Sequence, residues 1–394
     1  MIKAVTLKIL FISDVYFPRI NGVSTSIRTF VKQMQAMGHD VHLIAPDYGK
    51  KTEDDAWIKR IPARKIYFDP EDKLMKFGAV IDTLSDLRKE KYDLIHMHTP
   101  FVAHYLGVKL AHLLDVPCVE TYHTFFEDYL HLYLPIIPKP IAKALARLIS
   151  QRQCNKVDAI VAPSQPMLHV LREYGITTKG EVVPTGLQAH SFEKADGKAF
   201  RAKYGIEQDR PMALFVGRVA FEKNIGFLLQ MWVHLIKKMP NALLVIAGEG
   251  PAEKSLHALS HKLGLENNVR FLGYLDRNTE LNACYQSADL FVFASKSETQ
   301  GLVLLEAMAQ ATPVVAIAEL GTKSILIEGE GALIAPDEEI EFANKVERVL
   351  SDKALRQQLS KAGLSYVKAQ WTDKVQAERM IGFYQEVVDL KKQA

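Results

Sequence analysis

The sequence predicts an α/β protein built from two doubly wound parallel sheets in tandem. Short apolar runs alternate with helical stretches along the chain, which is the pattern of parallel strands covered by helices on both faces. The same alternation restarts near the middle of the chain. A length of 394 residues is too great for one ordinary core but fits two domains of typical size.

The first half of the chain contains the apolar runs of one module. Strands are expected at Leu7–Ile12, Val41–Ala45, Leu94–Met97, Cys118–Thr121 and Ala159–Ala162. Between the first two, residues 25–37 predict a helix that ends at Gly38.

The second half repeats this organisation. Strands are expected at Ala213–Val216, Leu243–Ala247, Val269–Leu272, Leu290–Phe293 and Val314–Ile317. The helix expected from Ile225 to Met239 has apolar residues at helical spacing, and Pro240 follows it as a stop signal.

The domain boundary is expected between Pro184 and Ala199, in the polar, turn-rich stretch PTGLQAHSFEKADG. The expected domains are residues 1–190 and 191–373, with a last helix within residues 374–394 set apart from the second module. Doubly wound sheets bind ligands at the carboxyl ends of their strands. Two such sheets facing each other therefore predict a ligand site in the cleft between them.

Composition limits the classes of function. A net charge of +3 gives no global electrostatic case for nucleic-acid binding, and three cysteines without a CxxC pair predict neither a zinc site nor a disulfide framework. The only apolar run near the start, Ile9–Ile12, is far shorter than the roughly 7–15 residues of a secretory core or the about 20 of a spanning helix. We therefore expect a cytoplasmic protein.

Two cations follow the first strand of the second module. Arg218 and Lys223 lie in the connection from Gly217 to the next helix, where an arginine can grip phosphate oxygens and a lysine supplies a point charge. The alternative is a pair of solvated surface charges.

Two glutamates flank the run TQGLVLL. Glu298 falls in the loop after the strand expected at Leu290–Phe293, and Gly301 opens the next helix, where free backbone N–H groups can approach a phosphate. Glu306 lies inside the apolar run LVLLEAMA, where a carboxylate is costly unless something binds it. Ribose hydroxyls are suitable donors for it, and a salt bridge across the helix face is the alternative.

Two features of the first module could contribute to the same site. Asn21-Gly22 lies between the first strand and the first helix, where Gly22 would let backbone amides reach a diphosphate, although Asn-Gly is also a common turn. His123 follows the strand Cys118–Thr121 and could donate a hydrogen bond to a sugar hydroxyl or the reacting centre. Neither GxGxxG, GxxxxGK[ST], Asp-x-Asp nor HExxH occurs, so a dinucleotide, a P-loop and a metal site are not expected.

A basic segment follows Pro138. Lys139, Lys143 and Arg147 recur at a spacing of four and line one helical stripe, opposite the apolar positions of IAKALARLI. This pattern is typical of a helix at an anionic membrane surface, and an ordinary amphipathic helix packed on its own sheet is the alternative.

Taken together, these residues resemble the family 4 retaining glycosyltransferases, which have the two-Rossmann GT-B fold. The resemblance rests on the G-R-x4-K run, on SETQGLVLLEAMA and on the spacing between them. It implies a nucleotide-diphospho-sugar donor, without metal, bound by Gly22, Arg218, Lys223, Gly301, Leu302, Val303 and Glu306. His123, Glu298, Arg218 and Lys223 are the implied catalytic group, with Glu298 near the donor sugar and Glu306 on the ribose. The family's last helix crosses back onto the first domain, and residues 374–392 are placed to do so.

Within the family, INGVSTSI, TYHTFFEDYLHLY and SETQGLV look like the diacylglycerol glucosyltransferases. This resemblance implies transfer of glucose from UDP-glucose to a lipid hydroxyl with retention of the α configuration, by an enzyme peripheral on the inner face of the plasma membrane. A soluble or polysaccharide acceptor, a nucleotide-sugar epimerase, a phosphorylase-like enzyme and a non-enzymatic nucleotide-sugar sensor are the alternatives.

Overall fold

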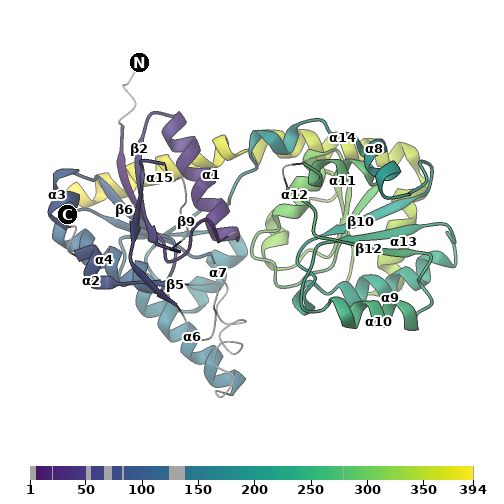
Figure 1. Ribbon diagram of the computed structural model, residues 1–394, viewed down its shortest axis with the longest axis horizontal. Coiled ribbons are helices and arrows are strands. Elements are labelled where there is room, and N and C mark those ends of the chain that lie inside the picture. Colours follow the sequence, from purple (N-terminus) through teal and green to yellow (C-terminus); the bar gives the residue numbers. More distant parts are fainter. Residues whose placement is uncertain are drawn as a thin grey trace. The chain divides into compact units, whose positions relative to one another are not determined.

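The computed structural model describes residues 6–19, 21–49, 55–65, 73–81, 84–123, 138–277 and 279–393. The chain divides into two compact units (Figure 1). The first consists of Met1–Gly186 together with Asp373–Ala394, and the second of Leu187–Thr372.

The first unit is built on a seven-stranded sheet in the order β3-β2-β1-β6-β7-β8-β9, in which every neighbouring pair is parallel. Its strands are β1 (Lys8–Ile12), β2 (Asp40–Pro46), β3 (Ile58–Ile61), β6 (Leu94–Met97), β7 (Cys118–Thr121), β8 (Ala159–Ala162) and β9 (Lys179–Val182). A separate antiparallel pair is formed by β4 (Ala63–Lys65) and β5 (Lys73–Met75). The helices are α1 (Gly22–Ala36), α2 (Phe77–Ile81), α3 (Leu84–Lys89), α4 (Val102–Leu114), α6 (Lys139–Cys154), α7 (Gln165–Glu173) and α15 (Asp373–Gln393).

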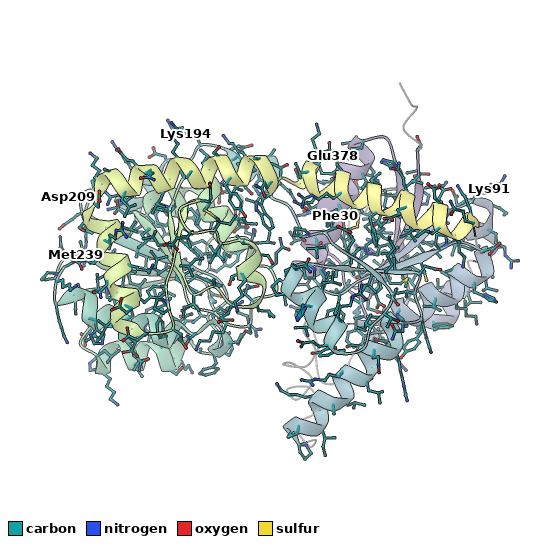
Figure 2. The ribbon with its side chains drawn as sticks, turned by 180° about the vertical axis from the view of Figure 1, so that it is seen from behind. Phe30, Lys91, Lys194, Asp209, Met239 and Glu378 are labelled. Atoms are coloured by element: carbon teal, nitrogen blue, oxygen red, sulfur yellow. The ribbon has the colours of Figure 1, made fainter. Side chains whose placement is uncertain are left out.

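The C-terminal helix α15 belongs to the first unit, where it lies alongside α1 (Figure 1). Its residues Met380, Phe383 and Val387 share one hydrophobic core with Ile27 and Phe30 of α1. Figure 2 shows this helix from behind, with Glu378 on its outer side and Phe30 on its inner side. Fully burying a side chain of this size stabilises a fold by about 1.5–3 kcal/mol, so several together fix α15 on this unit.

The second unit has a six-stranded parallel sheet in the order β12-β11-β10-β13-β14-β15. Its strands are β10 (Met212–Val216), β11 (Leu243–Ala247), β12 (Val269–Gly273), β13 (Leu290–Phe293), β14 (Val314–Ala316) and β15 (Ala332–Ile334). Its α-helices are α8 (Gly197–Lys203), α9 (Ile225–Ile236), α10 (Glu253–Lys262), α11 (Leu281–Ser287), α12 (Leu302–Ala309), α13 (Glu339–Ser351) and α14 (Lys353–Gln370). Short 3₁₀ turns are η1 (Ala189–Phe192), η2 (Phe221–Lys223) and η3 (Leu320–Ser324).

The predicted fold class is confirmed: both units are doubly wound parallel sheets, and the last helix returns to the first unit. Every predicted strand forms, with ends that differ by a residue or two. The edge strands β3, β9 and β15 were not predicted. β3 and β9 lie at the sheet edges and are only partly buried, so they do not need the continuous apolar run that marks a central parallel strand.

Candidate functional site

Lys223 and Glu298 meet at the carboxyl ends of two neighbouring strands of the second unit. Lys223 ends η2, in the connection after β10, and Glu298 lies in the loop after β13. Because β10 and β13 are adjacent and parallel, these loops emerge side by side. Lys223 Nζ donates to Glu298 Oε2 at 2.6 Å, and each side chain is only 20% exposed. Lys223 is therefore not a solvated surface charge.

Two hydrogen bonds from side chains to backbone carbonyls join the two loops beside this ion pair. Ser295 Oγ donates to the Glu222 carbonyl at 3.0 Å, and Asn224 Nδ2 donates to the Ala294 carbonyl at 3.3 Å. Asn224 has a left-handed backbone (φ 54°) and occupies the position before the first residue of α9, without a side-chain capping hydrogen bond to the helix. The positions of Lys223 and Glu298 are thus set by the loops as well as by their own ion pair.

A third loop, after β14, is hydrogen-bonded to the backbone of Glu298. The Gly321 N–H donates to the Glu298 carbonyl at 2.8 Å. A Cβ on Gly321 would lie 2.0 Å from the Thr299 carbonyl oxygen, so only glycine fits this approach.

Arg218 takes no part in this ion pair. Its side chain is exposed, and the described part of the chain gives it no ion-pair partner. Its backbone is held firmly, since the Val219 N–H donates to the Glu249 carbonyl at 2.9 Å and a Cβ on Gly248 would lie 2.0 Å from the Gly217 oxygen. Arg218 is an available cation on a fixed loop.

Gly301 begins α12 with a left-handed backbone (φ 88°) that a side chain would strain. Leu302 and Val303 are the first residues of the helix, where backbone N–H groups lack intrahelical partners. The helix therefore offers free N–H donors at the end nearest Glu298, and such a terminus favours an anion.

Glu306 is buried, at 6% exposure, and the protein supplies its partners. Arg277 Nη2 donates to Oε1, and the hydroxyl of Tyr285 donates to Oε2 at 2.9 Å. Burial, with a smaller effect from the Glu306 charge, raises the pKa of Tyr285 well above its usual range, so the phenol remains protonated and able to donate. The cost of burying Glu306 is met within the fold, so burial alone gives no argument for a ligand there.

Sequence reasoning missed Arg277 and Tyr285. Arg277 lies in the loop after β12, at the same edge of the sheet as the other site residues, and that position is a usable signal. Tyr285 lies on α11 within an ordinary helical pattern, and nothing local distinguishes it from a core residue.

In the first unit, His123 lies near two further histidines: His96 is part of β6 and His98 directly follows it. His123 Nε2 lies 3.1 Å from His98 Nδ1, and the two rings are stacked. His96 hydrogen-bonds through Nε2 to Thr121 Oγ1 at 2.7 Å and through Nδ1 to the hydroxyl of Tyr384 on α15. The contact with His98 leaves His123 Nδ1 as the ring nitrogen available to a ligand.

These three histidines are neutral at physiological pH. Burial lowers the pKa of His123 to about 4. Burial, with a smaller effect from the neighbouring imidazoles, lowers the pKa values of His96 and His98 well below their usual range. His123 can therefore act as a neutral hydrogen-bonding group and not as a standing positive charge.

Asp14 is a second buried group at this edge, and the sequence analysis did not identify it. Its Oδ2 accepts from Thr99 Oγ1 and from the Ala103 N–H at the start of α4, each at 2.9 Å, while buried Oδ1 has no hydrogen-bond partner. Burial raises the pKa of Asp14 to about 6, against the lowering effect of these two hydrogen bonds. A polar residue directly after a buried strand was the available signal.

Gly22 is the first residue of α1, and Asn21 caps the helix by accepting from the Ser24 N–H at 2.8 Å. A Cβ on Gly22 would meet nothing within 4 Å, so packing does not require glycine there.

Helix α6 carries the basic segment. Its packed face consists of small residues at a spacing of four, Ala142, Ala146 and Ser150, while Ile141 and Leu148 are 59% and 41% exposed. The helix packs on its own unit, as the alternative expects, but through these small residues, and it leaves Ile141 and Leu148 exposed. Lys139 begins the helix, but its side chain and residues 124–137, with most of TYHTFFEDYLHLY, lie outside the described residues.

Lys143 and Arg147 lie between the packed and the exposed faces of α6. Lys143 is half-buried, while Arg147 is exposed and stacks its guanidinium over the ring of Tyr174, 5.4 Å from its centre.

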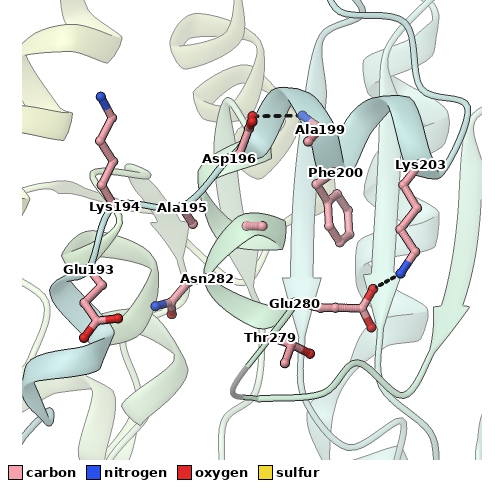
Figure 3. Close-up of a pocket in the computed structure, with 11 residues that line it drawn as sticks. Glu193, Lys194, Ala195, Asp196, Ala199, Phe200, Lys203, Thr279, Glu280 and Asn282 are labelled. Atoms are coloured by element: carbon pink, nitrogen blue, oxygen red, sulfur yellow. Dashed lines mark hydrogen bonds and ion pairs between the residues drawn. The ribbon is translucent and has the colours of Figure 1, made fainter.

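A pocket in the second unit lies between residues 193–203 and the start of α11 (Figure 3). Lys203 pairs there with Glu280, and Asp196 accepts from the Ala199 N–H at 2.9 Å. The pocket contains none of the site residues predicted from sequence. In the described ranges, no group of three or more His, Cys, Asp or Glu side chains could hold a metal ion, and no helix is long and apolar enough to cross a membrane.

Comparison with known proteins gives two family matches. Residues 20–190 match the family described as Glycosyltransferase Family 4, and residues 196–365 match Glycosyl transferases group 1. An alpha-monoglucosyldiacylglycerol synthase of Streptococcus pneumoniae is 32% identical over 79% of this chain and 71% of its own length. The enzyme of the same name from Acholeplasma laidlawii is 31% identical, over 78% and 80%.

Solved structures share the fold at low sequence identity. Anabaena HepE in complex with UDP has a TM-score of 0.75 at 17% identity, covering 96% of this chain and 100% of that one. The sucrose-phosphate synthase of Thermosynechococcus elongatus also has a TM-score of 0.75, at 22% identity, over 97% and 100%. With two parallel-sheet units, matches to both family descriptions and relatives above 30% identity, this chain belongs to the family 4 glycosyltransferases of GT-B fold.

Proposed function

We propose that this enzyme transfers a hexose from a nucleotide-diphospho-sugar, UDP-glucose in the first instance, to the hydroxyl of a membrane lipid such as diacylglycerol, with retention of the α configuration. The second unit binds the donor and the first unit, with α15, binds the acceptor. The donor assignment rests on one arrangement above all: Lys223, Glu298 and the N-terminus of α12 at one sheet edge.

Each of these groups binds the part of the nucleotide sugar that suits its charge and its hydrogen-bonding capacity. Lys223, Arg218 and the free N–H groups of Leu302 and Val303 are donors suited to the diphosphate. Glu306, oriented by Arg277 and Tyr285, accepts from ribose hydroxyls. Glu298 accepts from hydroxyls of the sugar.

In the proposed reaction the acceptor oxygen bonds to the anomeric carbon as the bond from that carbon to the diphosphate breaks. The acceptor proton passes to the departing diphosphate, and retention requires attack from the face that the diphosphate leaves. Negative charge grows on the leaving group, and Lys223, Arg218 and the α12 terminus stabilise it there. His123, which is neutral, offers Nδ1 to a sugar or acceptor hydroxyl and forms no covalent intermediate.

The exposed apolar face of α6 supports a lipid acceptor. Ile141 and Leu148 are seven positions apart and share one helix face, and Arg147 borders it. An apolar stripe with basic residues at its edge is suited to an anionic bilayer surface, where each basic residue adds about 1 kcal/mol. We propose that the enzyme acts at the cytoplasmic side of the membrane, and the names of the two synthases support the same acceptor class.

Donor and acceptor are tested by a matrix of UDP- and GDP-sugars against diacylglycerol, glycolipids and soluble sugars, read by mass spectrometry. The expected product is a hexosyl lipid whose anomeric proton has the small NMR coupling of an α-glycoside. A product with soluble acceptors alone would overturn the lipid acceptor and favour a transferase that acts on a soluble or polysaccharide acceptor. Change of the donor without any acceptor would indicate an epimerase.

The phosphate role of Lys223 is tested by calorimetry. Lys223→Ala is expected to weaken UDP binding and abolish turnover, and unchanged UDP affinity would contradict the assignment.

The membrane role of α6 is tested by liposome flotation. Binding should rise with anionic lipid and fall with salt, since charge attraction is screened by salt. An Ile141→Ser, Leu148→Ser variant should lose it, while Leu390→Ser, which changes an exposed leucine of α15 in the same unit, should retain it. Membrane binding that does not depend on lipid charge, on salt or on the two α6 substitutions would contradict the membrane role of this helix.

A further inference from the structure

Lys223 already has an anionic partner within the protein. Its ammonium donates to Glu298 Oε2 at 2.6 Å, and both side chains are largely removed from solvent. The loops that carry them are held by the hydrogen bonds of Ser295, Asn224 and Gly321, so neither residue can move far from the other. A diphosphate that binds Lys223 must therefore do so close to the Glu298 carboxylate.

A phosphate and a carboxylate at one lysine affect each other in two ways. The ammonium has three donors and can serve both anions, but it loses part of its interaction with each. The two anions also repel each other, and more strongly in a partly desolvated site than in water. Glu298 thus weakens the binding of any diphosphate that relies on Lys223.

An attached sugar changes this balance. The sugar hydroxyls are hydrogen-bond donors, and a carboxylate only accepts. Hydrogen bonds from the sugar to Glu298 therefore compensate for the interaction with Lys223 that Glu298 loses to the diphosphate. The nucleoside diphosphate left after transfer has no such hydroxyls next to the phosphate. The Glu298 carboxylate therefore favours binding of the nucleotide sugar and disfavours binding of the nucleoside diphosphate product.

We propose that Glu298 is a specificity residue that disfavours the nucleoside diphosphate relative to the intact nucleotide sugar by competing with it for Lys223. The inference rests on the proposed donor site and adds a role in product release to the sugar contact assigned to Glu298. Product release limits many transferases that enclose their substrates, so a residue that weakens product binding would speed turnover.

The test compares UDP and UDP-glucose binding by calorimetry in the unmodified enzyme and in Glu298→Gln. The amide keeps the size of the side chain and removes its charge. UDP is expected to bind about tenfold more tightly to Glu298→Gln, because one adjacent like charge is gone. UDP-glucose is expected to gain less, so the preference of the enzyme for donor over UDP should shrink.

A double-mutant cycle shows whether Lys223 mediates the effect. In a Lys223→Ala background, the gain in UDP affinity from Glu298→Gln should be clearly smaller, since the contested cation is absent and only the direct repulsion between the two anions is relieved. Glu347→Gln is the matched control: it removes the same charge from the same unit, on α13, where Glu347 pairs with Lys238 at 2.8 Å. This control should change neither affinity.

The outcomes separate the inference from the proposed function. UDP binding that is equal or weaker in Glu298→Gln, in a protein with an unchanged melting temperature, would overturn the competition. A gain in UDP affinity of the same size in Glu347→Gln, or in the Lys223→Ala background, would assign the effect to net charge and also overturn it. If the unmodified enzyme binds no nucleoside diphosphate, whether of uridine, guanosine, adenosine or thymidine, the proposed donor site itself has failed.

Discussion

The hydroxyl of Tyr285 holds one oxygen of the buried Glu306 carboxylate, and removing it gives a direct test of the ribose assignment. Tyr285→Phe leaves the ring and deletes a donor that lies 2.9 Å from Oε2, while Arg277 continues to hold Oε1. A hydrogen bond to a charged group contributes about 1.5–3 kcal/mol, and its loss leaves a buried oxygen without a partner. The second unit should be destabilised by about this amount, measured by urea denaturation.

The functional readout is the discrimination between UDP and 2′-deoxy-UDP. If Glu306 accepts from ribose hydroxyls, the unmodified enzyme should prefer UDP, because the deoxy compound cannot make the hydrogen bond that the 2′-hydroxyl donates to Glu306. Tyr285→Phe frees the carboxylate to reorient, so UDP affinity should fall by about tenfold, the equivalent of 1.4 kcal/mol, with little change for 2′-deoxy-UDP.

Tyr366→Phe is the matched control, since the Tyr366 hydroxyl also makes a buried 2.9 Å hydrogen bond in the second unit, to the Ile325 carbonyl. It should cost about 0.5–1.5 kcal/mol of stability and leave the UDP preference intact. The reasoning is refuted if Tyr285→Phe lowers both affinities equally, or if the unmodified enzyme does not distinguish the two nucleotides.

Three further predictions follow from local geometry and burial. Gly321→Ala would place a Cβ 2.0 Å from the Thr299 oxygen and displace the loop that supports Glu298. Calorimetry should then show a larger loss of affinity for the sugar donor than for UDP. Equal losses of the two affinities would contradict this prediction. Burial raises the pKa of Asp14 from 3.8 to about 6, so the folded state binds this proton more tightly than the unfolded state. The free energy of unfolding should therefore fall by about 2 kcal/mol as pH rises from 4 to 7. Asp14→Asn should flatten that fall in urea titrations at the two pH values. Burial lowers the pKa of His123 from 6.5 to about 4, so the unfolded state binds this proton more tightly and the free energy of unfolding should fall as pH falls through that interval. His123→Asn should reduce this acid sensitivity. An equal slope of the free energy of unfolding against pH in the variant would show that His123 is not the group responsible.

Much of the fold could be predicted because the central strands are buried on both faces. β6, β7 and β8 are fully buried, and such strands require continuous apolar runs that any local reading of the sequence detects. The candidate site benefits from the same logic, since polar residues directly after those runs must lie at the carboxyl edge of a sheet. Lys223, Glu298 and Gly301 were found in this way.

Other features had only an ambiguous local signal. The periodicity of α6 correctly gave an amphipathic helix, but it did not determine which face packs. The helix turns its small residues, Ala142, Ala146 and Ser150, inward, which permits a close approach to the sheet and leaves Ile141 and Leu148 outside. Face selection depends on the space available beneath a helix, and that space is set by residues far away in the sequence.

The sequence by itself determined the two doubly wound units and the loops that carry the site residues, because strand burial and turn chemistry are local properties. Only the tertiary structure decided what those residues contact. Lys223 and Glu298 are 75 positions apart and meet because β10 and β13 are neighbours in the sheet order. Glu306 obtains Arg277 and Tyr285 from a loop and a helix that precede it, which turns a costly buried charge into a fixed acceptor. Such pairings depend on strand order and loop closure, which no local pattern of residues encodes.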